Sequence, residues 1–178
     1  MTISATTNTE RGERSGRPLL TRSGAQLLTE LAADIRYRRL AELAPLLVEH
    51  ERDERHVAQF EHTLAQADRW DAFLASADIL DSNPAAFDGR IWLGMRAQVR
   101  LIDGSSAWVR PVHPYEAILD DERISVTSPL GAAIHGSRLG DDVVVHAPIG
   151  TWTCRILAVD LGEGVVTKAP RRRKAAGR

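Results

Sequence analysis

The chain has 178 residues, 43% of them hydrophobic and 26% charged, with a formal net charge of −1 and a single cysteine. This length allows one ordinary domain or two small ones, and one cysteine excludes a disulfide framework. No apolar run reaches the roughly 20 residues that a membrane-spanning helix needs, so we expect a cytoplasmic protein with no membrane segment.

Charge is distributed unevenly along the chain. Residues 19–80 hold 11 acidic and 7 basic side chains, residues 81–164 again hold 11 and 7, and six bases but no acid follow Glu163. Two acidic regions disfavour sequence-specific DNA binding, because neutralising phosphates requires a basic face. We predict that residues 165–178 form a basic disordered tail, with weak contact to DNA or RNA as the sharper alternative.

The first 18 residues have almost no large apolar side chains and are rich in Thr, Ser, Gly and Arg. Such a segment cannot bury enough apolar surface to offset the entropy lost on ordering. We therefore predict a disordered N-terminal tail over residues 1–18.

Residues 19–80 show helical spacing of apolar residues in two arms. In the first arm, Ser23 is the expected N-cap, and Pro45 is expected to kink the helix or start a new turn. The apolar stripe of this arm consists of Leu27, Leu28, Leu31, Ile35, Leu43, Leu46 and Leu47. The second arm, "VAQFEHTLAQADRWDAFLASADIL", follows the charged run "EHERDERH". Two amphipathic arms around a polar tip predict an antiparallel coiled-coil hairpin.

Residues 81–88 carry turn chemistry and are predicted to be a linker. Residues 89–164 change to the period of two that is typical of strands, and Asp103-Gly104 predicts a hairpin turn between the first two of them. Three more strand-like runs follow in "RISVTS", "DDVVVHAP" and "TWTCRILAVD".

One short helix is expected among these strands. Ser128 is its predicted N-cap, Pro129 occupies its first position, and Gly136 stands where a helix of about two turns would stop. The second half is therefore predicted to be a small antiparallel β domain with one short helix, which makes the whole chain α+β.

The segment "ISVTSPLGAAIHGSRLGDDVVVHAPIG" resembles the C-terminal domain of the bacterial Gre transcript-cleavage and elongation factors (GreA/GreB) and of their relative Rnk. One continuous register matches a strand, a helix start, a helix stop and a second strand. The matching positions are Ile124, Ser125, Val126, Ser128, Pro129, Leu130, Gly131, Gly136, Gly140, Asp141 and Val143. In addition, "TRSGAQLLTEL" resembles the start of the Gre coiled coil. The resemblance implies an FKBP-like fold for residues 89–164, in which the matched residues are scaffold rather than catalyst.

The resemblance also implies a function. A Gre-family protein binds RNA polymerase, with its C-terminal domain at the rim of the secondary channel and its hairpin entering that channel. It modulates elongation or initiation, has no catalytic residues of its own, and at most stimulates the polymerase's own transcript cleavage. We expect such a protein to act as a monomer.

Cleavage stimulation depends on the hairpin tip, where two carboxylates three residues apart help to hold a second Mg²⁺ in the polymerase active site. Mg²⁺ prefers hard oxygen ligands, and two metal ions can clamp the attacking and leaving oxygens of phosphoryl transfer. The implied Mg²⁺ is shared with the polymerase, and we expect no intrinsic metal site. The acidic candidates at the tip are Glu49, Glu51, Asp53 and Glu54.

The tip departs from the family pattern in either alignment of the arms. One register places Asp53 first and His56 where the second acid belongs, and the other places Glu54 first and then Val57. Glu51 and Glu54 keep the three-residue spacing in a shifted register. The alternative to a metal-holding role is that this run is only a solvated charged loop. Two readings therefore stay open besides a cleavage factor: a non-cleaving, Rnk-like regulator, and an interaction module whose partner is not RNA polymerase.

Overall fold

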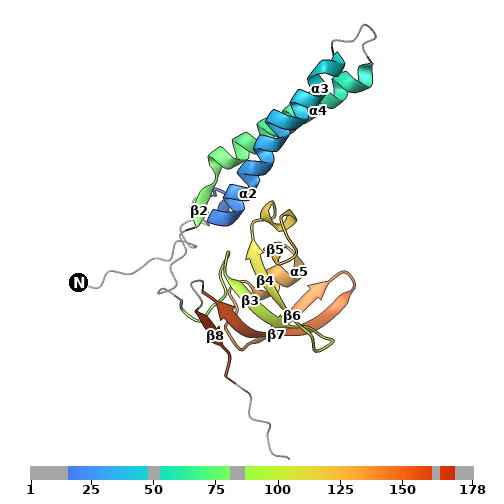
Figure 1. The fold of residues 1–178 in the computed structure, drawn as a ribbon. Helices are drawn as coiled ribbons and strands as arrows, with labels where there is room; N and C mark the ends of the chain where they lie inside the picture. Colours follow the sequence, from blue (N-terminus) through green and yellow to red (C-terminus); the bar gives the residue numbers. More distant parts are fainter. Residues whose placement is uncertain (1–15, 48–52, 81–86, 162–164, 171–178) are drawn as a thin grey trace, which may run out of the picture. The chain divides into compact units, whose positions relative to one another are not determined.

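The computed structural model in Figure 1 describes residues 16–47, 53–80, 87–161 and 165–170. The chain divides into two compact units, with the boundary between Leu80 and Asp81. The first is a helical hairpin and the second is a curved sheet with a short helix, so the predicted α+β class is confirmed. Within the described residues, no helix combines the length and the apolarity that crossing a bilayer requires.

The first arm of the hairpin begins at a short strand and changes its helical type along its length. Its elements are β1 (Leu19–Thr21), α2 (Arg22–Ala33), the π-helix η1 (Asp34–Arg39), α3 (Leu40–Leu43) and the 3-10 helix η2 (Ala44–Leu47). The N-cap is Thr21, whose hydroxyl accepts the backbone N–H of Gly24 at 2.9 Å, so the prediction of Ser23 as the cap is wrong. Pro45 lies in the 3-10 turn, which agrees with the predicted new turn at that residue.

The second arm is α4 (Glu54–Ser76), which ends in the strand β2 (Asp78–Leu80). β2 pairs in parallel with β1, and this pairing closes the base of the hairpin. Arg17 reinforces the base because its guanidinium donates to the carbonyl of Ser76 at 2.9 Å and pairs with Asp78 at 3.0 Å. The two-stranded base had not been predicted.

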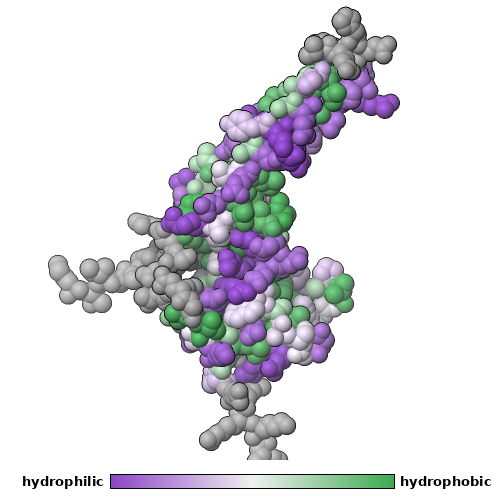
Figure 2. Space-filling view, viewed as in Figure 1, coloured by the Kyte–Doolittle hydropathy of each residue, from purple (hydrophilic) through white to green (hydrophobic). Residues whose placement is uncertain are grey.

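The arms pack through a narrow apolar line. Leu28, Ala32 and Ile35 are buried on the first arm, and Thr63 and Ala67 are buried on α4. The predicted stripe is wrong at Leu27, which is 39% exposed. Hydrophilic side chains cover much of the hairpin surface visible in Figure 2.

The π-helix explains how this line continues past a polar run. Its closing bond joins the N–H of Leu40 to the carbonyl of Ile35, five residues back. In a regular α-helix, the residue one turn after Ile35 on the buried face would be Arg39. The wider π-helical turn places the half-buried Leu40 there instead. Arg39 stays exposed as a result.

The C-terminal domain is built on six strands and two short helices. They are β3 (Arg96–Arg100), β4 (Ser106–Val112), the 3-10 helix η4 (Glu116–Ile118), β5 (Arg123–Ser125), α5 (Pro129–Ile134), β6 (Asp142–Ala147), β7 (Gly150–Asp160) and β8 (Val166–Lys168). The strands follow the order β5-β4-β3-β7-β6, and β8 pairs with β7. The predicted turn at Asp103-Gly104 does join two antiparallel strands, β3 and β4.

Two expectations for this domain are corrected. β5 runs parallel to β4, so the sheet is not purely antiparallel. The reason is the crossover of residues 113–122, which brings Arg123 back beside Arg110, so that β5 runs in the same direction as the last residues of β4. β8 lies in the segment predicted to be a disordered tail, and the N–H of Ala169 extends its pairing by donating to the carbonyl of Leu157 at 2.7 Å.

The core of the domain is one apolar cluster between the curved sheet and α5. Its buried members are Ile91, Ala97, Val99, Val109, Ile134, Val143, Val145, Cys154, Ile156 and Val159. Cys154 is thus a core residue, and burial raises the pKa of its thiol, which makes the reactive thiolate less available.

Candidate functional site

The structure describes two of the four acidic residues predicted at the hairpin tip. Asp53 is the N-cap of α4, and its carboxylate accepts the backbone N–H of Arg55 at 2.9 Å. Glu54 is the first residue of the helix and is exposed, and a negative charge at this position favours the helix dipole. Glu49 and Glu51 lie outside the described residues.

The two described acids are adjacent in sequence rather than three residues apart. Their helical neighbours at that distance are His56 and Val57, whose N–H groups donate to the carbonyl of Asp53. The Asp53 carboxylate already serves the helix end, so a metal ion would compete for one of its oxygens. Over the part of the chain that the structure describes, no cluster of three or more His, Cys, Asp or Glu side chains could hold a metal.

Behind the tip, an arginine clamp joins the arms. Arg36, in the π-helix, donates from Nε to Asp71 at 2.8 Å and from its terminal nitrogen to Asp68 at 2.6 Å. Hydrogen bonding to Asp68 is the main reason that the pKa of the Arg36 guanidinium rises. The clamp connects the π-helix to α4, so the wider turn and the pairing of the arms support each other.

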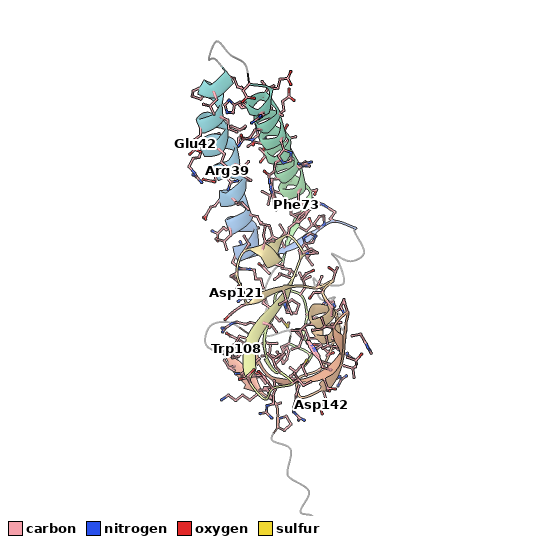
Figure 3. All side chains as sticks on the ribbon, turned by 90° about the vertical axis from the view of Figure 1, so that its right-hand side faces the viewer. Arg39, Glu42, Phe73, Trp108, Asp121 and Asp142 are labelled. Carbon is pink, nitrogen blue, oxygen red and sulfur yellow. The ribbon has the colours of Figure 1, made fainter. Side chains whose placement is uncertain are left out.

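Further ion pairs lie along the first arm. Asp34 pairs with Arg38, whose hydrogen bond lowers the pKa of the Asp34 carboxyl, and also with Arg39 at 3.5 Å. Arg38 and Glu42 add a looser pair at 3.6 Å. Figure 3 labels Arg39 and Glu42 on this arm. These exposed pairs leave the hairpin with a mixed charged surface.

In the C-terminal domain, the predicted strand, cap and helix occupy the predicted register. The Ser128 hydroxyl accepts the N–H of Gly131 at 3.2 Å, and Pro129 is the first residue of α5. Gly131 lies so close to Ser125 that an added Cβ would collide with the Ser125 carbonyl oxygen. The helix ends at Ile134, and Gly136 follows two residues later with a φ of +78°, in the left-handed conformation that glycine adopts readily.

The remaining matched residues shape the turn into β6. Gly140 has a φ of +97°. The Asp141 carboxylate accepts the N–H of Arg138 at 2.9 Å, and the N–H of Asp141 donates to the Arg138 carbonyl at 3.0 Å. Leu130 packs against the apolar core. Each of these contacts is made within the C-terminal domain itself, and the role of the matched residues as scaffold stays a prediction.

No functional residue was predicted from the sequence in the crossover of residues 113–122. This segment contains Glu116, which is fully buried, and exposes Tyr115 and Ile118 on the same short 3-10 turn. Acidic side chains usually lie at the surface and large apolar side chains in the interior, and this turn reverses both preferences. In the sequence, this reversal is visible only as the apolar-rich stretch "PVHPYEAIL", which does not follow the alternating pattern of a strand.

Comparison with known proteins finds relatives of the second unit. Residues 88–161 match the model of the family described as "Transcription elongation factor, GreA/GreB, C-term". Transcription elongation factor GreA of Nitrosococcus oceani is 33% identical over 87 residues, which cover 48% of this chain and 55% of that protein. GreA of Anaeromyxobacter sp. (strain K) is 37% identical over 105 residues, which cover 57% of this chain and 60% of that protein. The chain thus spans little more than half the length of these curated relatives.

Among solved structures, GreA factor homolog 1 (Gfh1) of Thermus thermophilus is similar to this chain. The match covers 81% of this chain and 99% of that one, at 28% sequence identity and a TM-score of 0.36. This TM-score is too low to support a statement about the overall fold or function.

Proposed function

We propose that the chain is a Gre-like transcription factor that acts on RNA polymerase. The premise is that it belongs to the GreA/GreB family through residues 88–161. The observation that carries this proposal is the family match over a complete C-terminal domain that follows a helical hairpin. The hairpin is a long, narrow element, since the 23 residues of α4 extend about 35 Å at 1.5 Å per residue.

The proposed mode of action assigns one task to each unit. The C-terminal domain, an FKBP-like curved sheet, docks at the rim of the secondary channel, and the hairpin enters the channel. The protein acts as a monomer in the cytoplasm and modulates elongation or initiation. It is not an enzyme, because it would act through the chemistry of the polymerase. Weak contact of the basic tail with DNA or RNA stays a prediction.

Within this proposal, we favour regulation without strong cleavage stimulation. Asp53 caps α4, and Glu54 has Val57 rather than an acid three residues later. A shared Mg²⁺ would have to be held by this capping carboxylate, by Glu54, or by Glu49 and Glu51. Since Mg²⁺ demands a near-octahedral set of oxygen ligands, an irregular tip is a poorer partner for it than two carboxylates on one helical turn.

The test is transcript cleavage in backtracked elongation complexes, with the bound protein quantified in the same sample. We expect binding with little added cleavage. Strong stimulation would overturn the regulatory version and leave the family proposal intact. Absence of binding would overturn the proposal that the protein acts on RNA polymerase and favour an interaction module with another partner.

Substitutions at the tip separate charge from helix capping. Asp53→Asn retains a side-chain acceptor suited to the N-cap, whereas Asp53→Ala removes it. If Asp53 supports cleavage through Mg²⁺, both variants lose the stimulation. If it acts only as the cap, Asp53→Asn behaves like the unchanged protein. Combined replacement of Glu49, Glu51 and Glu54 by Gln tests the remaining carboxylates.

A further inference from the structure

The crossover between β4 and β5, residues 113–122, is here called the η4 loop. Its short helix is closed by backbone hydrogen bonds: Glu116 N–H donates to the His113 carbonyl at 2.9 Å, and Leu119 N–H donates to the Glu116 carbonyl at 3.1 Å. The N–H of Tyr115 donates to Nδ1 of His113 at 3.3 Å. The loop is therefore internally ordered although it lies between two strands.

The C-terminal end of the loop is fixed to the sheet. Arg110 N–H donates to the Glu122 carbonyl at 2.7 Å, where β4 meets β5. The Asp120 carboxylate accepts the N–H groups of Glu122 and Arg123, at 3.1 and 3.0 Å, and pairs with the Arg123 side chain. These contacts restrict how the loop can move and reduce the entropy that a partner would have to remove on binding.

A buried carboxyl group marks the side of the loop that faces inward. Glu116 is fully buried, and Arg123 is nearly so. Burial and the neighbouring Arg110 lower the pKa of Arg123, and attraction to the Glu116 carboxylate opposes them. A buried carboxylate is costly unless it is paired, so Glu116 holds its side of the 3-10 turn against the domain.

The opposite side of the turn presents two apolar side chains to solvent. Tyr115 is 49% exposed and Ile118 is 66% exposed. They are three residues apart, and side chains at this spacing eclipse each other on a 3-10 helix. The ring of Tyr115 also meets that of His113 edge to face, with centroids 5.4 Å apart. An ordered pair of this kind differs from the other exposed isoleucines of the domain, Ile102 and Ile149, each alone in a strand-connecting turn.

Negative charge borders this apolar pair. Asp120, Asp121 and Glu122 follow Ile118 almost directly, and Figure 3 labels Asp121 in this segment. Asp120 and Glu122 are engaged by Arg123 and Arg96, whereas Asp121 is exposed. A complementary protein surface would therefore offer an apolar pocket with basic residues at its edge.

We propose that the η4 loop is the anchor through which the C-terminal domain docks on RNA polymerase, with Tyr115 and Ile118 entering an apolar pocket whose rim is basic. This inference rests on the proposed function, because it names the contact surface of the same partner. A partly exposed tyrosine beside an aliphatic residue on a rigid turn is the type of group that dominates binding energy at protein interfaces.

The experiment compares two double variants of the full chain for affinity to purified RNA polymerase. Tyr115→Ser with Ile118→Ser should weaken binding by about tenfold or more. The matched control, Ile102→Ser with Ile149→Ser, removes two exposed isoleucines from the same domain and should keep the affinity within about twofold. The charge variant Asp121→Lys should weaken binding by about threefold at low salt and less at high salt.

The outcomes separate the two proposals. If the unchanged protein does not bind polymerase, the proposed function fails. If it binds and the Tyr115/Ile118 variant binds equally well, the docking inference is overturned while the proposed function stands. Equal loss in both double variants also overturns it, because the effect would then not be specific to the loop. Should the Tyr115/Ile118 variant fail to fold, Asp121→Lys decides the question: unchanged affinity at low salt sinks the inference.

Discussion

The hairpin buries a single line of apolar side chains between two helices, whereas the C-terminal domain surrounds a cluster of ten buried residues with a curved sheet and a helix. Near the hairpin line, the arms are joined by Arg36 with Asp68 and Asp71. In the C-terminal domain, the strands pair across long stretches of sequence, as β3 does with β7. The two units therefore depend on different interactions for their stability.

This difference indicates how each unit suits its proposed task. Exposed ion pairs contribute little to stability and are weakened by salt, so a hairpin held by a thin apolar line and polar clamps should open more readily. A sheet with a continuous apolar core resists local change. We expect the hairpin to adapt to its surroundings and the C-terminal domain to act as a rigid platform. The following predictions test that contrast.

The largest effects should come from truncating the two cores. Ile156→Ala should destabilise the C-terminal domain by about 4 kcal/mol, and Ile35→Ala should destabilise the hairpin by about 3 kcal/mol. Both side chains are buried, but the narrow hairpin line can collapse more easily around the lost atoms. Denaturant unfolding followed by circular dichroism for the helices and by tryptophan fluorescence would measure both.

Each truncation should leave the other unit folded. Trp70 lies in α4, so the fluorescence is followed in a Trp70→Phe background, in which Trp92, Trp108 and Trp152 report on the C-terminal domain. Most of the helix content lies in the hairpin. If Ile156→Ala and Ile35→Ala each lowered both transitions together, the two units would unfold as one and the contrast between them would be wrong.

A slightly smaller effect is expected at the closest backbone approach in the C-terminal domain. Gly131→Ala should cost about 3 kcal/mol because the new methyl group collides with the Ser125 carbonyl, which is backbone and cannot turn aside. The matched control is Gly136→Ala, where the added methyl meets no atom but the left-handed φ costs about 1 kcal/mol. Similar losses in the two variants would contradict the close-approach explanation.

The register around these glycines is the part of the fold that the sequence predicted best. Ser128 and Pro129 are local signals for a helix start, and Gly136 is a local signal for its end. Asp103-Gly104 is an equally local signal for a hairpin turn. In each case the physical preference belongs to the residues themselves, so no distant partner is needed to recognise the structure.

The features that were missed depend on distant partners. β1 and β2 are three-residue strands whose pairing joins Leu19 to Asp78. The residues of neither segment indicate that it pairs with the other. β8 is a strand only because β7 offers an edge. The π-helix contains Arg36, whose two hydrogen-bond partners lie on the other arm. The capping role of Asp53 is a local feature, since an aspartate directly before a helical run is a favoured N-cap.

The next prediction concerns salt. Arg36→Met keeps much of the aliphatic length of the side chain but removes both hydrogen bonds to α4, so the hairpin transition should shift to lower denaturant concentration. The shift should shrink as salt is added, because screening already weakens the ion pairs of the unchanged protein. Arg38→Met is the control, since Arg38 pairs along its own arm, with Asp34 and Glu42. A larger loss for Arg38→Met would mean that pairing within the arm, rather than the clamp, stabilises the hairpin.

The smallest effect should appear in the C-terminal domain in mild acid. Burial lowers the pKa of His113, so the folded domain disfavours the protonated ring. The unfolded chain takes up a proton near the ordinary histidine pKa of about 6.5, so stability present above that value is lost as the pH falls toward the lower folded pKa. Protonation would also remove the Nδ1 acceptor used by the N–H of Tyr115. His113→Gln should flatten this decline in a pH series of unfolding midpoints, while an unchanged slope would show that His113 is not its source. Because His113 begins the η4 loop, the same titration would reveal whether the rigid presentation of Tyr115 depends on the neutral ring.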